Sequence, residues 1–239
     1  MSRLLANVYR IWAMSEKQAI VTIDGPSGVG KSTISRRLAA LLGYTYLDTG
    51  AMYRAVALGC QQHGVDTGDA QAVAAVLQGL SIALQPPGEQ DADVCVLLNG
   101  NDVSAAIRTP EMGMLASQVS ALPPVRQHLT ALQQQMGKKG NLVAEGRDTG
   151  TVVFPDAAWK FYLDASPEQR TIRRAGQLQE QGKEIDQQEL LQQIKARDKA
   201  DSQRSIAPLT RAKDAVYIDS SHLDADAVVE QMLSYIKGR

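Results

Sequence analysis

The sequence predicts a three-layer α/β fold around a five-stranded parallel β-sheet. Five short apolar runs alternate with helical patterns along the chain, at residues 19–23, 44–47, 141–145, 159–163 and 215–219. Strands that alternate with helices form parallel sheets covered by helices on both faces. A glycine-rich stretch also joins the first apolar run to the first helical pattern, at the place where this fold class carries a phosphate-binding turn.

The composition is that of one globular domain. The chain has 239 residues, of which 44% are hydrophobic and 21% charged, and its net charge is −1. We expect no nucleic-acid partner at this charge, and no membrane association because no apolar stretch approaches the length of a span. Cys60 and Cys95 lack metal-binding spacing, which favours free thiols in a reducing, cytoplasmic compartment. No self-complementary apolar stripe is evident, so we expect a monomer.

The first residues differ from the rest. Residues 1–13 are partly apolar, but Arg10 interrupts the run that a secretory signal would need. Met14 resembles a second start. We therefore expect residues 1–14 to be a poorly ordered leader and residues 15–239 to form the domain.

The glycine-rich stretch matches the P-loop motif. Its spacing is Gly25-x4-Gly30-Lys31-Ser32, between a strand and a helix. Backbone N–H groups of such a loop surround a polyphosphate, and the following helix points its positive end at the same place. Lys31 can reach the β and γ oxygens, and the Ser32 hydroxyl can hold Mg²⁺. This stretch predicts a nucleoside triphosphate site.

The segment after the P-loop helix predicts a second helix whose N-terminus could face a bound phosphate. Gly43 is suited to ending the first helix, and a helix from 51 to about 62 follows the strand at 44–47. Thr49 is a candidate N-cap for that helix, with Tyr53 and Arg54 about one turn further on. Alone, this pattern would more often be an ordinary cap with a solvated arginine.

The next region predicts a small antiparallel insertion, residues 80–106. A helix at 69–79 precedes it, and strands at 80–84 and 94–98 flank the turn cluster 86–88. Another tight turn follows at 99–102. Helices are then expected at 110–120 and 124–136. We assign about 48–136 to the region that binds the second substrate.

Helix signals are clear in the last third. Ser166, Pro167 and Gln169 mark a helix start, with an end near Gly182. Further helices are predicted at 186–202 and, with Asp224 as cap, at 224–237. The P-loop and the segments 48–50 and 146–148 each follow a strand. They should share one sheet edge, which predicts the active site.

Two arginine-bearing helices suggest a closing lid at about 166–205. Arg197, Asp201 and Arg204 share one helix face, and Arg170, Arg173 and Arg174 share a face of the preceding helix. Salt-bridged, solvated faces explain such spacings about equally well. Phosphoryl transfer, however, needs positive charge and exclusion of water. A lid therefore favours transfer to a second substrate, whereas a switch protein would need an Asn-Lys-x-Asp motif that the sequence lacks.

Several loops together resemble the bacterial cytidylate kinase family, the (d)CMP kinases of the nucleoside monophosphate kinase group. The motifs are Gly25-Pro26-Ser27-Gly28-x-Gly30-Lys31, Asp48-Thr49-Gly50-Ala51-Met52-Tyr53-Arg54, Ile107-Arg108-Thr109, Ala116-Ser117-Gln118-Val119-Ser120, Gly146-Arg147-Asp148-x-Gly150-Thr151-Val152-Val153-Phe154-Pro155-Asp156 and Arg197-Asp198-x-x-Asp201-x-x-Arg204. The resemblance runs from about residue 19 to the C-terminus. It implies ATP-dependent phosphorylation of CMP and dCMP in pyrimidine metabolism, with Mg²⁺.

The resemblance also implies roles for individual residues. The residues implied to bind ATP are Gly25, Pro26, Ser27, Gly28, Val29, Gly30, Lys31, Ser32, Thr33, Arg173 and Arg174. Those implied to bind CMP are Thr49, Tyr53, Arg54, Ser117, Arg126, Arg147, Asp148, Arg197, Asp201 and Arg204. Lys31, Arg147, Arg173 and Arg204 are the expected catalytic residues. Thr49 stands where relatives often have serine, and Ala200 where they can have a basic residue.

The implied base contacts agree with the chemistry of cytosine. Its N4 amino group donates, which suits Asp148, whereas N3 and O2 accept, which suits Arg126 and Ser117. Uracil reverses this polarity at N3 and position 4, so UMP should be a poorer substrate. Two alternatives stay open: a sibling kinase for UMP, AMP, shikimate or dephospho-coenzyme A, and an ATP-binding regulatory protein.

Overall fold

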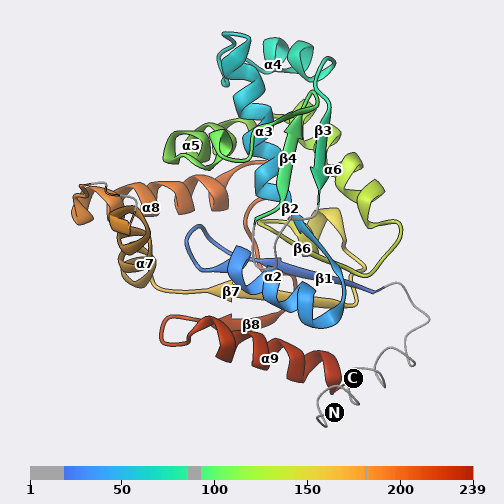
Figure 1. Cartoon of the computed structure of the whole chain (residues 1–239), viewed down its shortest axis with the longest axis vertical. Coiled ribbons are helices and arrows are strands. Elements are labelled where there is room, and N and C mark those ends of the chain that lie inside the picture. The colour runs from blue at the N-terminus through green and yellow to red at the C-terminus, as the bar shows by residue number, and fades with distance from the viewer. Residues whose placement is uncertain (1–18, 86–92, 181, 183, 239) are drawn as a thin grey trace.

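The computed structural model describes residues 19–85, 93–180, 182 and 184–238. Its centre is a parallel sheet with the strand order β2-β6-β1-β7-β8 (Figure 1). The strands are β1 (Ile20–Asp24), β2 (Thr45–Asp48), β6 (Leu142–Gly146), β7 (Trp159–Asp164) and β8 (Val216–Asp219). These bounds confirm the five predicted strands to within one residue. The expected leader at 1–14 lies outside the described residues.

β1 occupies the middle of the sheet. It pairs with β6 from Ile20↔Leu142 to Asp24↔Gly146, and with β7 from Val21↔Trp159 to Asp24↔Tyr162. A strand with neighbours on both sides and helices on both faces is largely buried, and every residue of β1 after Ile20 is buried. The register places the ends of β1 and β6 side by side at one edge.

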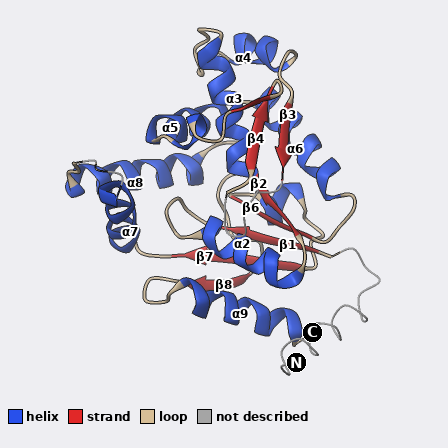
Figure 2. Ribbon diagram, in the orientation of Figure 1, coloured by secondary structure: helices blue, strands red, loops and turns tan. Residues whose placement is uncertain are grey.

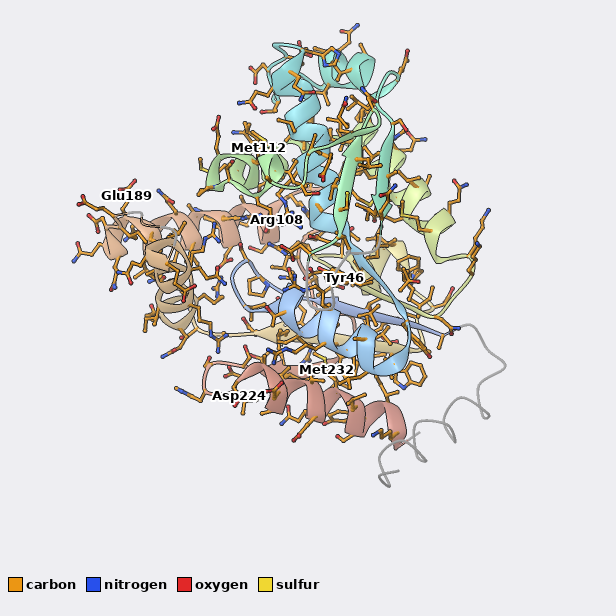
Figure 3. The ribbon with its side chains drawn as sticks, viewed as in Figure 1. Tyr46, Arg108, Met112, Glu189, Asp224 and Met232 are labelled. Carbon is orange, nitrogen blue, oxygen red and sulfur yellow. The ribbon has the colours of Figure 1, made fainter. Side chains whose placement is uncertain are left out.

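One face of the sheet is covered by α2 (Lys31–Leu42) and α9 (Ala225–Lys237). Val21 and Ile23 of β1 point to this side and pack in one cluster with Leu38 of α2 and Met232 of α9. Figure 3 marks Met232, whose side chain is fully buried. Burying a side chain of this size stabilises the fold by about 1.5–3 kcal/mol.

The other face is covered by α3 (Thr49–Gln62) and α6 (Pro123–Gly137). Leu142 and Ala144 of β6 pack there, whereas Val143 between them faces α2 and α9. This alternation follows from the two-residue period of a strand. α5 (Pro110–Val119) packs against α3. The predicted three-layer architecture is therefore confirmed (Figure 2).

The predicted insertion is a separate antiparallel sheet. It consists of β3 (Ile82–Gln85), β4 (Cys95–Leu98) and β5 (Asn101–Asp102). Asn99 and Gly100 form the tight turn before β5, with φ angles of 51° and 82°. The predicted turn at 86–88 lies outside the described residues. α4 (Ala70–Leu77) precedes the insertion and the 3₁₀ turn η1 (Ala106–Arg108) follows it.

Two helices project beyond the sheet edge, α7 (Pro167–Glu180) and α8 (Gln187–Gln203). The Ser166 hydroxyl accepts a hydrogen bond from the Gln169 N–H at 3.2 Å, so the predicted start of α7 is confirmed. Asp186 caps α8 by accepting from the N–H groups of Gln188 and Glu189. Within the described ranges, no helix is long and apolar enough to cross a membrane.

Candidate active site

The P-loop runs from the end of β1 to the start of α2, as predicted. Gly28 and Gly30 have φ angles of 75° and 97°, in the left-handed region that favours glycine. A Cβ on Gly25 would lie 2.0 Å from the Leu163 carbonyl oxygen of β7. Glycines at these positions therefore let the loop turn tightly against the neighbouring strand.

Lys31 is folded back onto its own loop. Its Nζ donates to the carbonyl oxygens of Gly25 and Pro26, at 2.8 and 2.6 Å. Burial, together with the charge of Arg147, lowers the pKa of Lys31 well below its ordinary value. A buried cation bonded to neutral carbonyls is poorly compensated, so a phosphate oxygen would be a better partner.

Ser32, in the first turn of α2, belongs to a small oxygen-rich group. Its side chain hydrogen-bonds with Glu145, and the Tyr46 hydroxyl also donates to that carboxylate. Burial and the charge of Asp48 raise the pKa of Glu145, whereas Lys31 opposes the rise. Among the described residues no three His, Cys, Asp or Glu side chains form a metal site. Ser32 and Glu145 nevertheless supply the oxygen chemistry that Mg²⁺ prefers, with a nucleotide's phosphates completing the set.

The predicted N-cap at Thr49 is wrong. The cap is Asp48, whose carboxylate accepts from the Ala51 N–H at 2.9 Å. Thr49 is already helical, and its hydroxyl instead donates to the Glu145 carbonyl oxygen at 2.7 Å. Asp48 also binds Arg54 Nη2 at 2.9 Å. Thr49 and Arg54 therefore still lie at the joint of β2 and β6, as expected.

Two of the predicted base-recognition residues are paired with each other. Arg126 of α6 donates to the Asp148 carboxylate, and both side chains are buried. Arg204 lies 3.5 Å from the other Asp148 oxygen. The Arg126 guanidinium stands 5.6 Å from the centre of the Tyr53 ring. The segments that carry these four predicted CMP-binding residues thus converge on Asp148.

A second cluster of polar side chains surrounds Asp201. Its carboxylate accepts from Arg147 Nε at 2.9 Å and from the Ser117 hydroxyl at 3.1 Å. Burial would raise the pKa of Asp201, but the charges of Arg147 and Arg197 lower it. Burial and the charge of Arg147 lower the pKa of Arg197 to about 10. Ser117 is thus bonded to Asp201 and not to Arg126 or Asp148.

Several polar atoms in this region have no hydrogen-bond partner among the described residues. They are Tyr53 Oη, Arg54 Nε, Arg197 Nε and Arg204 Nη2, and all four are buried, although Arg204 Nη2 still faces the Asp148 carboxylate at 3.5 Å. All four belong to predicted CMP-binding residues and are able to donate. A buried donor without a partner is costly, so a ligand rich in acceptor oxygens suits this region.

The three arginines of α7 do not act alike. Arg170 bonds to Asp198 and to the Ser27 carbonyl oxygen. Arg173 donates to backbone oxygens of Ser220 and, at 3.3 Å, Leu223. Arg174 donates to Gln177 at the surface. The predicted ATP-side roles of Arg173 and Arg174 remain predictions.

One residue to which the sequence analysis assigned no role, Asp24, connects the P-loop strand to the segment after β6. Asp24 accepts hydrogen bonds from the N–H groups of Thr149 and Gly150 and from the Thr149 hydroxyl. These bonds fix η2 (Thr149–Val153), a single π-helical turn that no sequence pattern predicted. The signal for Asp24 was present, since it is an acid that ends the first strand directly before the P-loop.

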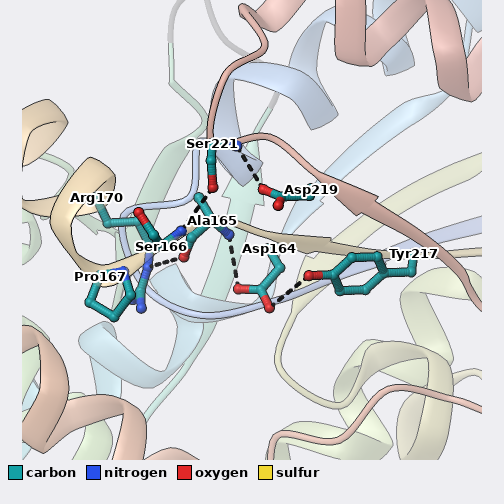
Figure 4. Close-up of a pocket in the computed structure, with 8 residues that line it drawn as sticks. All are labelled: Asp164, Ala165, Ser166, Pro167, Arg170, Tyr217, Asp219 and Ser221. Atoms are coloured by element: carbon teal, nitrogen blue, oxygen red, sulfur yellow. Dashed lines mark hydrogen bonds between the residues drawn. The ribbon is translucent and has the colours of Figure 1, made fainter.

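A cavity of about 420 Å³ lies beyond the ends of β7 and β8 (Figure 4). Asp164 and Tyr217 form one wall through a 3.3 Å hydrogen bond, and Arg170 lies at the other side. None of the residues that line it is a predicted substrate-binding residue. The cavity adjoins the P-loop side of the site without belonging to the group around Asp148 and Asp201.

The comparisons with known proteins agree with the geometry. The family model described as cytidylate kinase matches residues 21–238. The cytidylate kinase of Syntrophotalea carbinolica is 48% identical over 223 residues, covering 93% of this chain and 94% of the relative. That of Citrifermentans bemidjiense is 48% identical over 228 residues, covering 95% and 96%.

A longer relative also matches. The bifunctional pantoate ligase/cytidylate kinase of Synechococcus elongatus is 45% identical over 240 residues, covering 100% of this chain and 45% of the relative. The family match spans nearly all of the described fold, including the P-loop and both carboxylate groups. The chain therefore belongs to the cytidylate kinase family.

Proposed function

We propose that this protein transfers the γ-phosphoryl group of ATP to CMP and dCMP, giving ADP and CDP or dCDP. The observation that carries the proposal is the set of buried donors without hydrogen-bond partners on Tyr53, Arg54 and Arg197, together with the buried cation of Arg204. The phosphate of CMP supplies acceptor oxygens and negative charge in one group. Membership of the cytidylate kinase family gives independent support.

The mechanism follows from charge and position. A phosphate oxygen of CMP is already anionic at neutral pH, so the reaction needs no general base. Lys31 would leave its carbonyl partners for the β and γ oxygens of ATP. Arg147 and Arg204 would hold the acceptor phosphate in line, in a site where burial strengthens each electrostatic contact. Catalysis in this scheme is alignment of two anions by fixed cations.

Mg²⁺ fits the donor set at the start of α2. The Ser32 hydroxyl would hold it directly, and the Glu145 carboxylate beside Ser32 would orient the hydroxyl. When bound, the ion neutralises charge on the β and γ phosphates. Tyr46, which donates to Glu145, keeps that carboxylate turned toward Ser32.

Selection of cytosine would rest on Asp148. The carboxylate can accept from the N4 amino group, while Arg126 can donate to N3. Both groups are buried and already oriented by their mutual ion pair. Uracil would place an oxygen against Asp148, and an unsatisfied buried polar group costs about 1–3 kcal/mol. Ser117, bonded to Asp201, would act nearer the sugar.

The remaining assignments complete the proposal. Arg197 and Asp201 would contact the sugar, and Arg173 and Arg174 the ATP side of the lid. Thr49 and Arg54, at the joint of β2 and β6, would contact the CMP phosphate. We propose a cytoplasmic monomer that binds neither nucleic acid nor membrane.

The test is ADP production from ATP and Mg²⁺ with CMP, dCMP, UMP and AMP offered separately. A strong preference for CMP and dCMP is the expected result. Preference for UMP or AMP would keep the kinase chemistry but overturn the recognition residues. Lys31→Ala should abolish transfer while the protein remains folded by circular dichroism, and near-normal turnover would refute the role of the P-loop lysine.

A further inference from the structure

Ser27, at the tip of the P-loop, is tied to α8 by two separate routes. Arg197 Nη1 donates to the Ser27 hydroxyl at 3.1 Å. Arg170 Nη1 donates to the Ser27 carbonyl oxygen at 3.1 Å. Arg170 is in turn held by Asp198 through two bonds of 3.0 and 2.6 Å. Arg197 and Asp198, two consecutive residues of α8, are therefore both linked to Ser27. Arg197 bonds to it directly, and Asp198 is linked to it through Arg170.

The second route is rigid. The Arg170 side chain is only 3% exposed, and its Nε donates to the Ala165 carbonyl oxygen at 2.9 Å. Figure 4 shows Arg170 beside Ala165, where this bond is drawn. A bidentate arginine–carboxylate pair has a fixed geometry. Arg170 is thus a connector between α7, α8 and the P-loop, and all three of its nitrogens are engaged.

The residues that α8 presents beyond this contact are those proposed to bind CMP. Arg197 and Asp201 lie about one turn apart on α8, and Arg204 directly follows the helix as its C-cap, so a movement of α8 reaches all three. Arg197 Nη1 also lies 3.3 Å from the position that a Cβ on Gly113 of α5 would occupy. A displacement of Ser27 would therefore reach the CMP side through a packed helix.

ATP binding has a way to displace Ser27. Lys31 now bonds to the carbonyl oxygen of Pro26, which belongs to the peptide that joins Pro26 to Ser27. A polyphosphate competes for Lys31 and releases that carbonyl. The peptide can then rotate, and Ser27 carries both of its contacts to α8 with it.

We propose that Ser27 is a positioning residue that couples the ATP site to the CMP site through Arg197 and through the Arg170–Asp198 pair. The inference rests on the proposed function, because it concerns the same two substrates. Coupling of this kind is reciprocal: each nucleotide should tighten the binding of the other. A purely structural serine would change stability without changing this mutual effect.

The experiment measures the dissociation constant of CMP by calorimetry, without and with a saturating non-hydrolysable ATP analogue and Mg²⁺. We expect wild-type protein to bind CMP at least about fivefold more tightly with the analogue. Ser27→Ala removes the hydroxyl that contacts Arg197 but keeps the carbonyl that contacts Arg170, so this ratio should fall while CMP alone still binds. In Ser27→Ala combined with Asp198→Asn, which weakens the second route as well, the ratio should fall to near one. Asp198→Asn should also lower the ratio, and Ser27→Thr, which keeps the hydroxyl, should restore it.

Lys195→Gln is the matched control. Lys195 of α8 pairs with Glu168 of α7 at 3.4 Å. Both side chains are about half exposed, and this ion pair does not include a residue of the P-loop. This variant should keep the wild-type ratio. A wild-type ratio of one, or an undiminished ratio in Ser27→Ala, would overturn the coupling and leave the proposed function intact. Failure of wild-type protein to bind CMP would overturn both.

Discussion

The Asp24 carboxylate accepts hydrogen bonds from both the N–H and the hydroxyl of Thr149, at 2.9 and 2.7 Å. The two residues are 125 positions apart in the chain. Asp24 ends the strand that leads into the P-loop, and Thr149 directly follows Arg147 and Asp148. One buried carboxylate therefore fixes the position of the P-loop relative to the segment that is proposed to recognise CMP.

Replacing Asp24 should loosen that connection. In Asp24→Asn an NH2 group, which cannot accept a hydrogen bond, replaces one carboxylate oxygen. One or more of the groups of Thr149 and Gly150 that donate to Asp24 then lose their acceptor. Hydrogen bonds to a charged group contribute about 1.5–3 kcal/mol, so we expect a loss of that order in the free energy of unfolding measured with urea. KM for CMP should rise more than KM for ATP, because the anchored segment carries Arg147 and Asp148.

Asp69→Asn is the control for this substitution. Asp69 caps α4 at the surface by accepting from the N–H groups of Gln71 and Ala72. Asparagine caps helices as well as aspartate does, so stability and both KM values should stay at wild-type levels. Equal increases in both KM values for Asp24→Asn would show that Asp24 acts on the whole fold and not on the position of that segment.

Gly146, at the end of β6, tests how closely the segments that carry Thr49 and Thr149 approach each other. A Cβ there would lie 2.7 Å from Thr49 Oγ1 and from Thr149 Cγ2. Gly146→Ala should therefore separate these segments, with a cost of about 1–3 kcal/mol in the free energy of unfolding and a fall in kcat.

Gly176→Ala is the contrasting variant. Gly176 lies within α7, and a Cβ there meets nothing within 4 Å. The substitution should stabilise the protein by about 0.5–1 kcal/mol, as alanine does in helices. Thermal and urea unfolding of the two variants measure both effects, and a neutral Gly146→Ala would contradict the close approach.

The sheet could be predicted from the sequence because its strands are continuous apolar runs bounded by clear turn and cap residues. The P-loop was found because its spacing is set by backbone geometry. The hydrogen-bond partners of individual side chains could not be predicted, because they depend on neighbours that are distant in sequence. Arg170 and Arg173 share one helix face, yet one bonds to Asp198 and the other to the loop after β8.

Thr49 illustrates the same limit at close range. Asp48 and Thr49 are both good caps, and only the register of β2 decides which one precedes the helix. The π-helical turn at Thr149–Val153 is held by Asp24, and no pattern within residues 149–153 reveals a contact with a residue 125 positions away. Ser117 follows the same rule, because its partner Asp201 lies 84 positions away.

Asp201 should make stability depend on pH in a defined direction. Its pKa is lowered from 3.8 because the charges of Arg147 and Arg197 outweigh burial. A carboxylate with a lowered folded-state pKa stabilises the protein fully above its unfolded value, and this stabilisation is lost as pH falls through the folded value. The free energy of unfolding should therefore fall less steeply below pH 3.8 in Asp201→Asn than in wild-type protein. Urea titrations at several acidic pH values measure the two slopes, and equal slopes would contradict the proposed charge pairing.

Asp148 offers the sharpest test of base recognition. In Asp148→Asn the side chain can donate to the oxygen at position 4 of uracil as well as accept from the amino group of cytosine. We expect the ratio of kcat/KM for CMP over UMP to fall by about tenfold or more, since 1.4 kcal/mol corresponds to a factor of ten. Stability will also change, because Arg126 and Arg204 both lie against this carboxylate. The ratio of kcat/KM for CMP over UMP does not depend on that change in stability, since both values are measured on the same folded protein. A ratio that stays constant while both kcat/KM values fall would assign Asp148 to holding Arg126 and Arg204, and would remove it from reading the base.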